Sequence, residues 1–239
     1  SNNYYGLENL SKIPGTVGSA PVQNIGAYGA EQKDCFHSLT AVNLTSGERI
    51  ELTNADCKFD YRFSIFKTDD FRNKYFVESV RYKLSHKPII NANYKDIQVK
   101  MNNENIANPD AKYIFKAIEE IREAKLPDPD KVGNAGSFFK NPIVSLNKFT
   151  ELQLLYEAIP SYPDNAGKKI PAAWLIENCG LKGYRIGDAG ISDKHSLILV
   201  NYGNASGTEI FNLSEYIIAK VNEKFGIMLE REVIIVSNS

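Results

Sequence analysis

The 239 residues include 28 Lys or Arg and 29 Asp or Glu, which gives a formal net charge of -1. A chain this close to neutral has no broad positive field for phosphate backbones or anionic membranes, so we expect no nucleic-acid and no membrane partner. Its longest apolar runs, such as Leu197 to Val200, are far shorter than the roughly 20 residues that cross a bilayer. The 43% of apolar residues suffice for a packed core.

Cysteine and histidine are sparse, with 3 of each. The cysteines are odd in number and widely spaced without a Cys-x-x-Cys, which argues against a disulfide framework or a zinc site and fits a reducing cytoplasm. The histidines are equally scattered, so we expect no metal. These residues are Cys35, Cys57, Cys179, His37, His86 and His195.

The first half of the chain predicts an ordered loop followed by antiparallel strands. Ser11 to Gly29 is rich in Gly, Pro and Ser but carries apolar anchors, which is typical of a buried loop rather than a linker. β-Favouring stretches follow at 39–44 and 49–52, separated by a turn at Ser46-Gly47, and at 75–84, where apolar and polar residues alternate.

Helical periodicity dominates the second half. A helix is predicted from Asn108-Pro109, as N-cap and first residue, to just before Pro127. Ser206 and Glu209 form a capping box for the last helix, and Gly226 ends it. The further predicted elements are helices at 149–158, 172–179 and 210–225 and a closing strand at 229–236.

The predicted fold class is α+β, with strands concentrated before Leu126 and helices after it. The Pro-rich stretch at 126–130 is the best candidate for a domain boundary. Residues 1–126 are predicted to form one domain and 127–226 a second, with 227–239 as a closing strand.

Four segments combine small and polar residues with apolar anchors. Glycines at 15, 18, 26 and 29 in the first would let backbone amides approach a phosphate or a flat cofactor ring. Its spacing matches neither Gly-x-Gly-x-x-Gly nor a P-loop, so a tight structural loop remains an equal alternative on spacing alone. The segments are 13–29, 61–67, 133–142 and 229–233.

These segments resemble, in order, the flavin-contacting loop, arginine motif, catalytic serine motif and terminal glutamate motif of the UDP-N-acetylenolpyruvoylglucosamine reductases. The resemblance extends through Lys125-Leu-Pro-Asp-Pro, Ala172-Ala-Trp-Leu-Ile and Leu181-Lys-Gly, and covers essentially the whole chain. It implies that residues 1–126 are the second half of a two-subdomain FAD-binding domain with a mainly antiparallel sheet, and that 127–226 are an α+β substrate-binding domain.

The family belongs to bacterial peptidoglycan precursor synthesis. Its members use NADPH to reduce FAD, and then reduce UDP-N-acetylglucosamine enolpyruvate to UDP-N-acetylmuramate. The resemblance therefore implies a cytoplasmic, NADPH-linked flavin oxidoreductase, expected to be a monomer. The family's N-terminal flavin subdomain, with its Gly-rich pyrophosphate loop, has no counterpart before Tyr4. We therefore expect a shortened chain, in which 227–239 would return to the missing subdomain.

Three positions match the family's catalytic residues. Ser137 matches the proton donor, although a lone serine more often bonds to backbone in a turn. Arg62 matches the arginine that holds the substrate carboxylate and stabilises the developing enolate, a role that suits its planar fork. Glu232 matches the glutamate that assists enolate stabilisation or proton traffic.

The resemblance also implies binding residues. For FAD it implies hydrogen bonds from Ser19, Gln23 and Asn24 and backbone contacts at Gly15 and Gly26. For the substrate it implies a closing tyrosine that packs on the nucleotide, and groups for the diphosphate and sugar. These positions are Tyr94, Lys125, Asn141, Lys182 and His195, and a purely structural histidine is an equal alternative for the last.

Two other classes of function compete. The chain could be a UDP-sugar-binding fragment without bound FAD or activity, and a flavin absorbance spectrum would separate this from an active enzyme. It could also be another oxidoreductase with the same fold and a different substrate. Shared fold explains a cofactor loop, but not the serine, Lys-Leu-Pro-Asp-Pro and glutamate motifs together.

Overall fold

The structure, a computed structural model, describes residues 3–236. The chain divides into two compact units, Ser1–Arg122 and Glu123–Ser239. The division falls in the last turn of helix α2 (Ala111–Lys125), a few residues before the predicted boundary at Pro127. Each unit has its own apolar core, so each is described separately.

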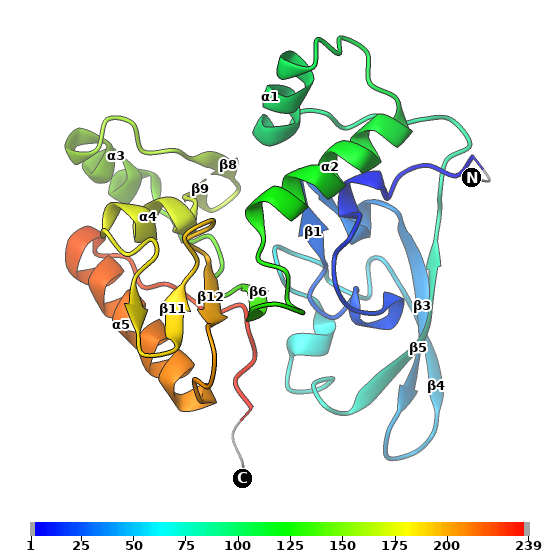
Figure 1. The fold of residues 1–239 in the computed structure, drawn as a ribbon. Coiled ribbons are helices and arrows are strands. Elements are labelled where there is room, and N and C mark those ends of the chain that lie inside the picture. Colours follow the sequence, from blue (N-terminus) through cyan, green and yellow to red (C-terminus); the bar gives the residue numbers. More distant parts are fainter. Residues whose placement is uncertain (1–2, 237–239) are drawn as a thin grey trace. The chain divides into compact units, whose positions relative to one another are not determined.

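The first unit contains the predicted antiparallel sheet, in the order β4-β3-β5 (Figure 1). Leu39 and Ala41 on the central strand are fully buried, because alternate side chains of a strand face the same side. Gly47, with φ 71°, closes the predicted hairpin turn. The strands are β3 (Phe36–Asn43), β4 (Arg49–Thr53) and β5 (Tyr75–Tyr82), and a short pair, β1 (Gly26–Ala27) and β2 (Ala30–Glu31), precedes them.

Two helices complete the first unit. Helix α2 begins at Ala111 rather than at Pro109, because the Asp110 carboxylate accepts a hydrogen bond from the Tyr113 amide at 2.6 Å and caps the helix there. Helix α1 (Lys95–Asn103) was not predicted. Its residues are mostly polar and only Ile97 is buried, so its position depends on tertiary packing against α2.

The second unit has two antiparallel sheets of short strands, β10-β11-β12-β6 and β7-β9-β8. The sequence pattern did not predict them, because strands of two to five residues carry too few side chains to show a period of two. They are β6 (Gly133–Ser137), β7 (Ile143–Val144), β8 (Tyr162–Asp164), β9 (Gly167–Lys169), β10 (Arg185–Ile186), β11 (Ala189–Ile191) and β12 (Ile198–Asn201).

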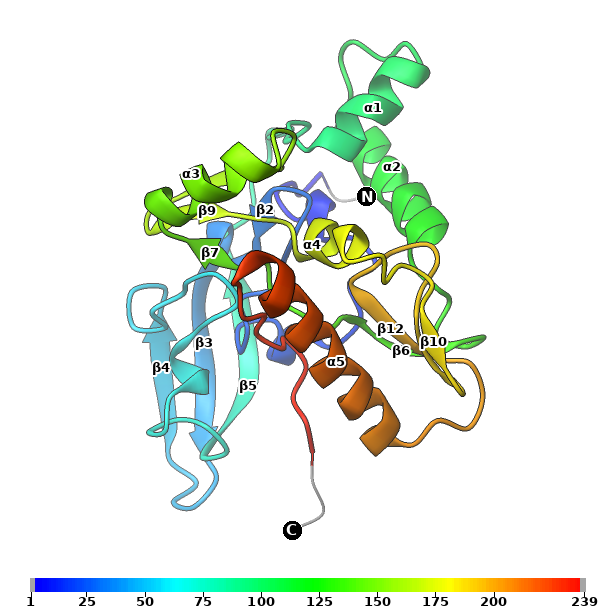
Figure 2. The same ribbon diagram turned by 90° about the vertical axis from the view of Figure 1, so that its left-hand side faces the viewer.

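Helices α4 and α5 pack together, and α5 also packs on β11 and β12 (Figure 2). The predicted capping box of α5 is confirmed, since Ser206 and Glu209 bond reciprocally, and Gly226 ends the helix with φ 62°. Helix α3 begins earlier than predicted, because Ser145 accepts a hydrogen bond from the Lys148 amide and caps it. The helices are α3 (Leu146–Leu155), α4 (Ala172–Asn178) and α5 (Gly207–Phe225).

The predicted closing strand at 229–236 is wrong as a regular strand. The segment makes a single bridge, between Phe139 and Arg231, flanked by hydrogen bonds from the Lys140 amide to the Glu230 carbonyl and from the Glu232 amide to the Phe138 carbonyl, both 2.9 Å. Pairing stops there and leaves Ile234 to Val236 exposed. Positions 237–239 lie outside the described residues.

The α+β class is confirmed, since every strand pair described is antiparallel and helices accompany the sheets in both units. Within residues 3–236, no helix combines the length and the apolar character needed to cross a membrane.

Substitution of two leucines on helices of the second unit tests which side chains form its apolar core. Leu213→Ala removes a side chain that is 2% exposed, whereas Leu154→Ala removes one that is 84% exposed. We expect the first to lower the free energy of unfolding by about 2–5 kcal/mol and the second by much less. Denaturant unfolding of the two variants measures this, and equal losses would contradict the assignment of the core.

Candidate functional site

The predicted flavin loop is exposed over residues 14–17 and again at Ser19. Gly15 has φ 113°, a conformation that favours glycine. Ser19 holds the turn, because its hydroxyl donates to the Thr16 carbonyl at 2.8 Å and accepts from the Thr16 amide at 3.1 Å. Val17 is 61% exposed.

This loop fits FAD chemically. Small exposed residues leave backbone amides accessible to a diphosphate, and an exposed apolar side chain offers contact to a flat ring. Gln23, half-buried, follows in the same loop. The individual FAD contacts predicted for Gly15, Ser19 and Gln23 stay predictions.

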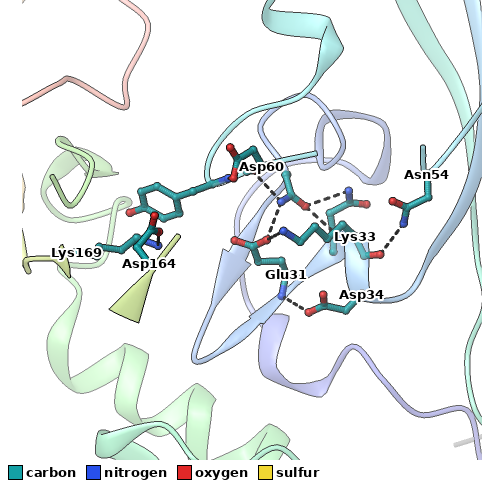
Figure 3. Close-up of polar contacts among 10 residues, drawn as sticks. Glu31, Lys33, Asp34, Asn54, Asp60, Asp164 and Lys169 are labelled. Atoms are coloured by element: carbon teal, nitrogen blue, oxygen red, sulfur yellow. Dashed lines mark hydrogen bonds and ion pairs between the residues drawn. The ribbon is translucent and has the colours of Figure 1, made fainter. Parts of the chain in front are cut away.

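Asn24 differs from these loop residues because it is completely buried. Its amide nitrogen donates to the Glu31 carboxylate at 2.9 Å and to the Asp60 carbonyl at 3.1 Å. Its amide oxygen accepts from the Lys33 amide at 3.2 Å and from the Gln32 side chain at 3.4 Å (Figure 3). The side chain therefore joins the loop to two other segments of the first unit.

Arg62 lies in a tight turn of the first unit, between residues Asp60 and Phe63, which bond to each other in both directions. Its φ of 53° is unusual for a residue with a side chain. The guanidinium donates to the Gly26 carbonyl at 2.7 Å and lies 5.4 Å from the centre of the Tyr61 ring. The arginine is thereby held in one orientation.

Gly26 is a point of close approach. A Cβ atom built there would lie 2.9 Å from Cγ of Glu31 and 3.0 Å from a guanidinium nitrogen of Arg62. Glu31 and Arg62 therefore both pack closely against Gly26, and a side chain there would require its neighbours to shift.

Tyr94 directly precedes helix α1 and packs in an edge-to-face contact against Tyr28, with ring centres 5.2 Å apart. Both rings belong to the apolar cluster around Ile97, Ile114 and Ile118. Burial raises the pKa of Tyr28. The predicted closing tyrosine is thus part of a packed aromatic pair in this structure.

Ser137 ends strand β6, where it pairs with Ile198, and it is exposed. Within residues 3–236 its hydroxyl makes no hydrogen bond, so it does not serve to satisfy backbone in a turn. Gly136, with φ 70°, turns the chain immediately before it, and the buried Phe138 and Phe139 anchor the chain after it.

Glu232 lies on the segment that bonds to the chain after Ser137, since its amide donates to the Phe138 carbonyl at 2.9 Å. Arg231 anchors this segment on helix α5 by donating to the Ser214 hydroxyl at 2.8 Å and pairing with Glu215. Glu230, one residue earlier, pairs with Lys140. The backbone thus brings position 232 close to position 137 although the two are far apart in sequence.

Lys182 and His195 come together around Glu177 at the end of α4. The Lys182 ammonium lies 2.8 Å from the Glu177 carboxylate, which also accepts from the Ser196 hydroxyl at 3.1 Å. Burial favours the neutral acid, but the hydrogen bonds from Lys182 and Ser196 and the nearby His195 outweigh it and lower the pKa of Glu177. Nothing in the sequence pattern singled out this glutamate.

Asn141 contacts the start of one helix, and Lys125 lies at the end of another. The Asn141 side chain accepts a hydrogen bond from the Ala172 amide at 2.9 Å and so binds the first turn of α4. Lys125 is the last residue of α2. The structure therefore brings Ser137 near Glu232, and Lys182 near His195. Arg62 belongs to the other unit, so its convergence with Ser137 and Glu232 stays a prediction.

Sequence models of two protein domains match this chain. Residues 128–236 match the C-terminal domain of UDP-N-acetylenolpyruvoylglucosamine reductase, and residues 1–53 match an FAD binding domain. Among solved structures, the UDP-N-acetylenolpyruvylglucosamine reductase of Thermus caldophilus is similar, with a TM-score of 0.61 and 24% identity over 96% of this chain and 64% of that one. The similarity to the Thermus caldophilus structure shows that the two proteins share a fold.

Curated relatives are much closer in sequence, and each is named UDP-N-acetylenolpyruvoylglucosamine reductase. The protein of Flavobacterium johnsoniae is 48% identical over 97% of this chain and 69% of its own length. Those of Porphyromonas gingivalis and Chromobacterium violaceum are 48% and 45% identical, over 97% and 98% of this chain and 68% and 69% of theirs. The chain thus spans about two thirds of the length of these relatives.

The matching FAD binding domain and the close relatives named as reductases define a flavin-dependent oxidoreductase. The chain belongs to the UDP-N-acetylenolpyruvoylglucosamine reductase family.

Gly26→Ala tests the close contact between Gly26 and the guanidinium of Arg62. Gly26 is absent from the positive-φ positions, so its backbone conformation suits alanine, and we expect the fold to persist while the Glu31 and Arg62 side chains and the Ala30 carbonyl shift to admit the new methyl group. The Nε–H resonance of Arg62 should shift. Gly207→Ala is the control, since a Cβ there meets no atom within 4 Å. An unchanged Arg62 resonance would contradict the close approach.

Lys182→Met tests the electrostatics of Glu177. The folded-state pKa of Glu177 is lowered, so its pairing stabilises the fold above the unfolded pKa and ceases to do so as the pH falls through the folded pKa. We expect the pKa of Glu177 to rise in an NMR titration. Because the side chains are 46% and 40% exposed, the loss of stability at neutral pH should stay below about 1 kcal/mol and vanish in acid.

Lys194→Met, at an exposed lysine of the loop that carries His195, is the matched control. A pKa of Glu177 that shifted equally in both variants would rule out a specific pair with Lys182.

Proposed function

We propose that this chain acts in the reduction of UDP-N-acetylglucosamine enolpyruvate to UDP-N-acetylmuramate, with FAD and NADPH, for peptidoglycan precursor synthesis. Relatives up to 48% identical bear the name of this reductase. The observation that carries the proposal is the exposed, unbonded hydroxyl of Ser137 within the described chain, beside the segment of Glu232. FAD, when bound, supplies the hydride-transfer chemistry, and the residues of the loop at 15–26 would hold it.

The reaction adds a hydride to the terminal carbon of the enolpyruvyl double bond and a proton to the neighbouring carbon. Negative charge develops between these events on that neighbouring carbon and its carboxylate. A protein must therefore supply a cationic group at the carboxylate and a proton donor at the carbon.

Ser137 is the proposed proton donor. A hydroxyl is an intrinsically weak acid, so proton transfer requires a site in which nearby charges favour the transient alkoxide. Its place between Gly136 and the buried Phe138 leaves room for a substrate carbon on one side and limits water on the other. Glu232 is proposed to assist proton movement or enolate stabilisation from the adjacent segment.

Arg62 is the proposed partner of the substrate carboxylate. A planar guanidinium can form two parallel hydrogen bonds to a carboxylate, and its positive charge stabilises the enolate as it develops. Its constrained turn supports this role, because a guanidinium held in advance needs little reorganisation during the reaction.

The proposed substrate-binding residues divide by chemistry. Lys125 and Lys182 supply positive charge for the diphosphate, and Asn141 and His195 supply polar contacts. Tyr94 is proposed to close over the nucleotide, which would require it to leave its present contact with Tyr28. The grouping of Lys182 and His195 around Glu177 supports a shared polar region.

We also propose a monomeric enzyme of the cytoplasm. The small number and wide spacing of the cysteines support a reducing compartment.

Ser137→Ala tests the proton donor. We expect substrate binding, measured by calorimetry, to persist, and NADPH oxidation that depends on the enolpyruvyl substrate to fall by at least about 100-fold, the usual contribution of a general acid. Ser161→Ala, at a half-buried serine of the same unit, should keep full activity. Full turnover by Ser137→Ala would remove this residue from the mechanism.

The same assays separate the competing class of protein. Binding of the UDP-sugar by a protein without flavin absorbance or NADPH oxidation would favour a binding fragment over an enzyme.

A further inference from the structure

The orientation of the buried Asn24 amide is determined by its partners. The Lys33 backbone amide can only donate, so the atom facing it is the amide oxygen, and the Asp60 carbonyl can only accept, so the atom facing it is the amide nitrogen. With Glu31 and Gln32 as the other two partners, both donors and both acceptor positions of the amide are used inside the protein.

This arrangement leaves the Asn24 side chain no spare hydrogen-bonding capacity for a flavin. It is also 0% exposed. Its contribution must therefore pass through the groups that it holds, namely the Glu31 carboxylate and the Asp60 carbonyl. Glu31 is in turn balanced by the Lys33 ammonium at 2.8 Å (Figure 3).

The Asp60 carbonyl opens the turn that carries Arg62. The Asp60 and Phe63 backbones bond to each other at 3.1 and 3.0 Å, which leaves Tyr61 and Arg62 as the two residues at the tip. Arg62 adopts φ 53°, a conformation that costs free energy and persists only when its surroundings enforce it. Two bonds do so at the backbone, from Asn24 to the Asp60 carbonyl and from the Lys67 ammonium to the Arg62 carbonyl at 2.8 Å.

The other end of Arg62 is held by the same loop. Its guanidinium donates to the carbonyl of Gly26, two residues after Asn24, and Gly26 pairs with Glu31 in the β1–β2 ladder. Both the backbone turn and the charged tip of Arg62 are therefore fixed to the short segment from 24 to 31, in which Asn24 provides the buried link.

We propose that Asn24 is a positioning residue for Arg62. Its hydrogen bond to the Asp60 carbonyl attaches the turn at 60–63 to the flavin loop, and this fixes the guanidinium where it meets the substrate carboxylate. This rests on the proposed role of Arg62. It assigns Asn24 to substrate recognition through Arg62 rather than to a direct contact with FAD.

The test compares two ligands by calorimetry with the full chain. UDP-N-acetylglucosamine enolpyruvate carries the carboxylate, and UDP-N-acetylglucosamine lacks it. Wild-type protein should prefer the first, and Arg62→Ala should abolish the preference. Asn24→Asp keeps the shape and the acceptors, loses both donors and places a carboxylate beside that of Glu31. It should reduce the preference by up to about tenfold, the effect of losing the hydrogen bond to the neutral Asp60 carbonyl.

The control is Asn54→Ala. Asn54 lies in the same network and donates to the carbonyls of Lys33 and Phe36, but has no bond to the turn of Arg62 (Figure 3). It should leave the preference unchanged. The double variant Asn24→Asp/Glu31→Gln restores a bond between 24 and 31 with reversed polarity, but not the bond to the Asp60 carbonyl. It should regain thermal stability over Asn24→Asp without regaining the preference, and it replaces the single variant if that does not fold.

The outcomes separate the two proposals. If Arg62→Ala abolishes the preference and a folded variant lacking the Asn24 donor keeps it, Arg62 binds the carboxylate and the positioning role of Asn24 is wrong. An equal loss of affinity for both ligands in Asn24→Asp would also overturn it, since this indicates general damage. If the wild-type protein shows no preference, the role of Arg62 fails and the positioning role fails with it.

Discussion

The hydrogen bonds between residues 138–140 and 230–232 are the constraint on which the second unit depends. They join the residues after strand β6 to a segment after the last helix, and they involve the buried Phe138 and Phe139. Arg231 fastens the same segment to α5. Because pairing is limited to one bridge, the segment fixes the position of Glu232 without extending the sheet.

In the first unit a single buried amide has the comparable role. Asn24 connects the flavin loop, the residues after β2 and the turn of Arg62, and every one of its hydrogen-bonding positions is used. A buried polar network of this kind stabilises one arrangement only when each member is satisfied. It explains how an arginine can be kept in an unfavourable backbone conformation at the tip of a two-residue turn.

The two arrangements use rigidity in the same way. The reactive or charged groups lie at the end of strand β6, at Ser137, and at the tip of a turn, at Arg62, while many of the atoms that hold these positions are buried or belong to strands. Catalysis by preorganised charge requires this division, because a group that moves during the reaction loses part of its stabilising effect. The membership of this chain in a reductase family gives each of these two positions a proposed chemical task.

The sequence by itself determined the α+β class, the hairpin at Gly47, the capped helix from Ser206 to Gly226 and, through resemblance, the family and its candidate residues. These features depend on local periodicity, capping chemistry or long motifs. The short strands, helix α1, the single bridge at Arg231 and the hydrogen-bond and ion-pair partners of Asn24 and Glu177 were decided only by tertiary structure. Their partners are distant in sequence, and a hydrogen bond between distant residues leaves no periodic pattern in the chain.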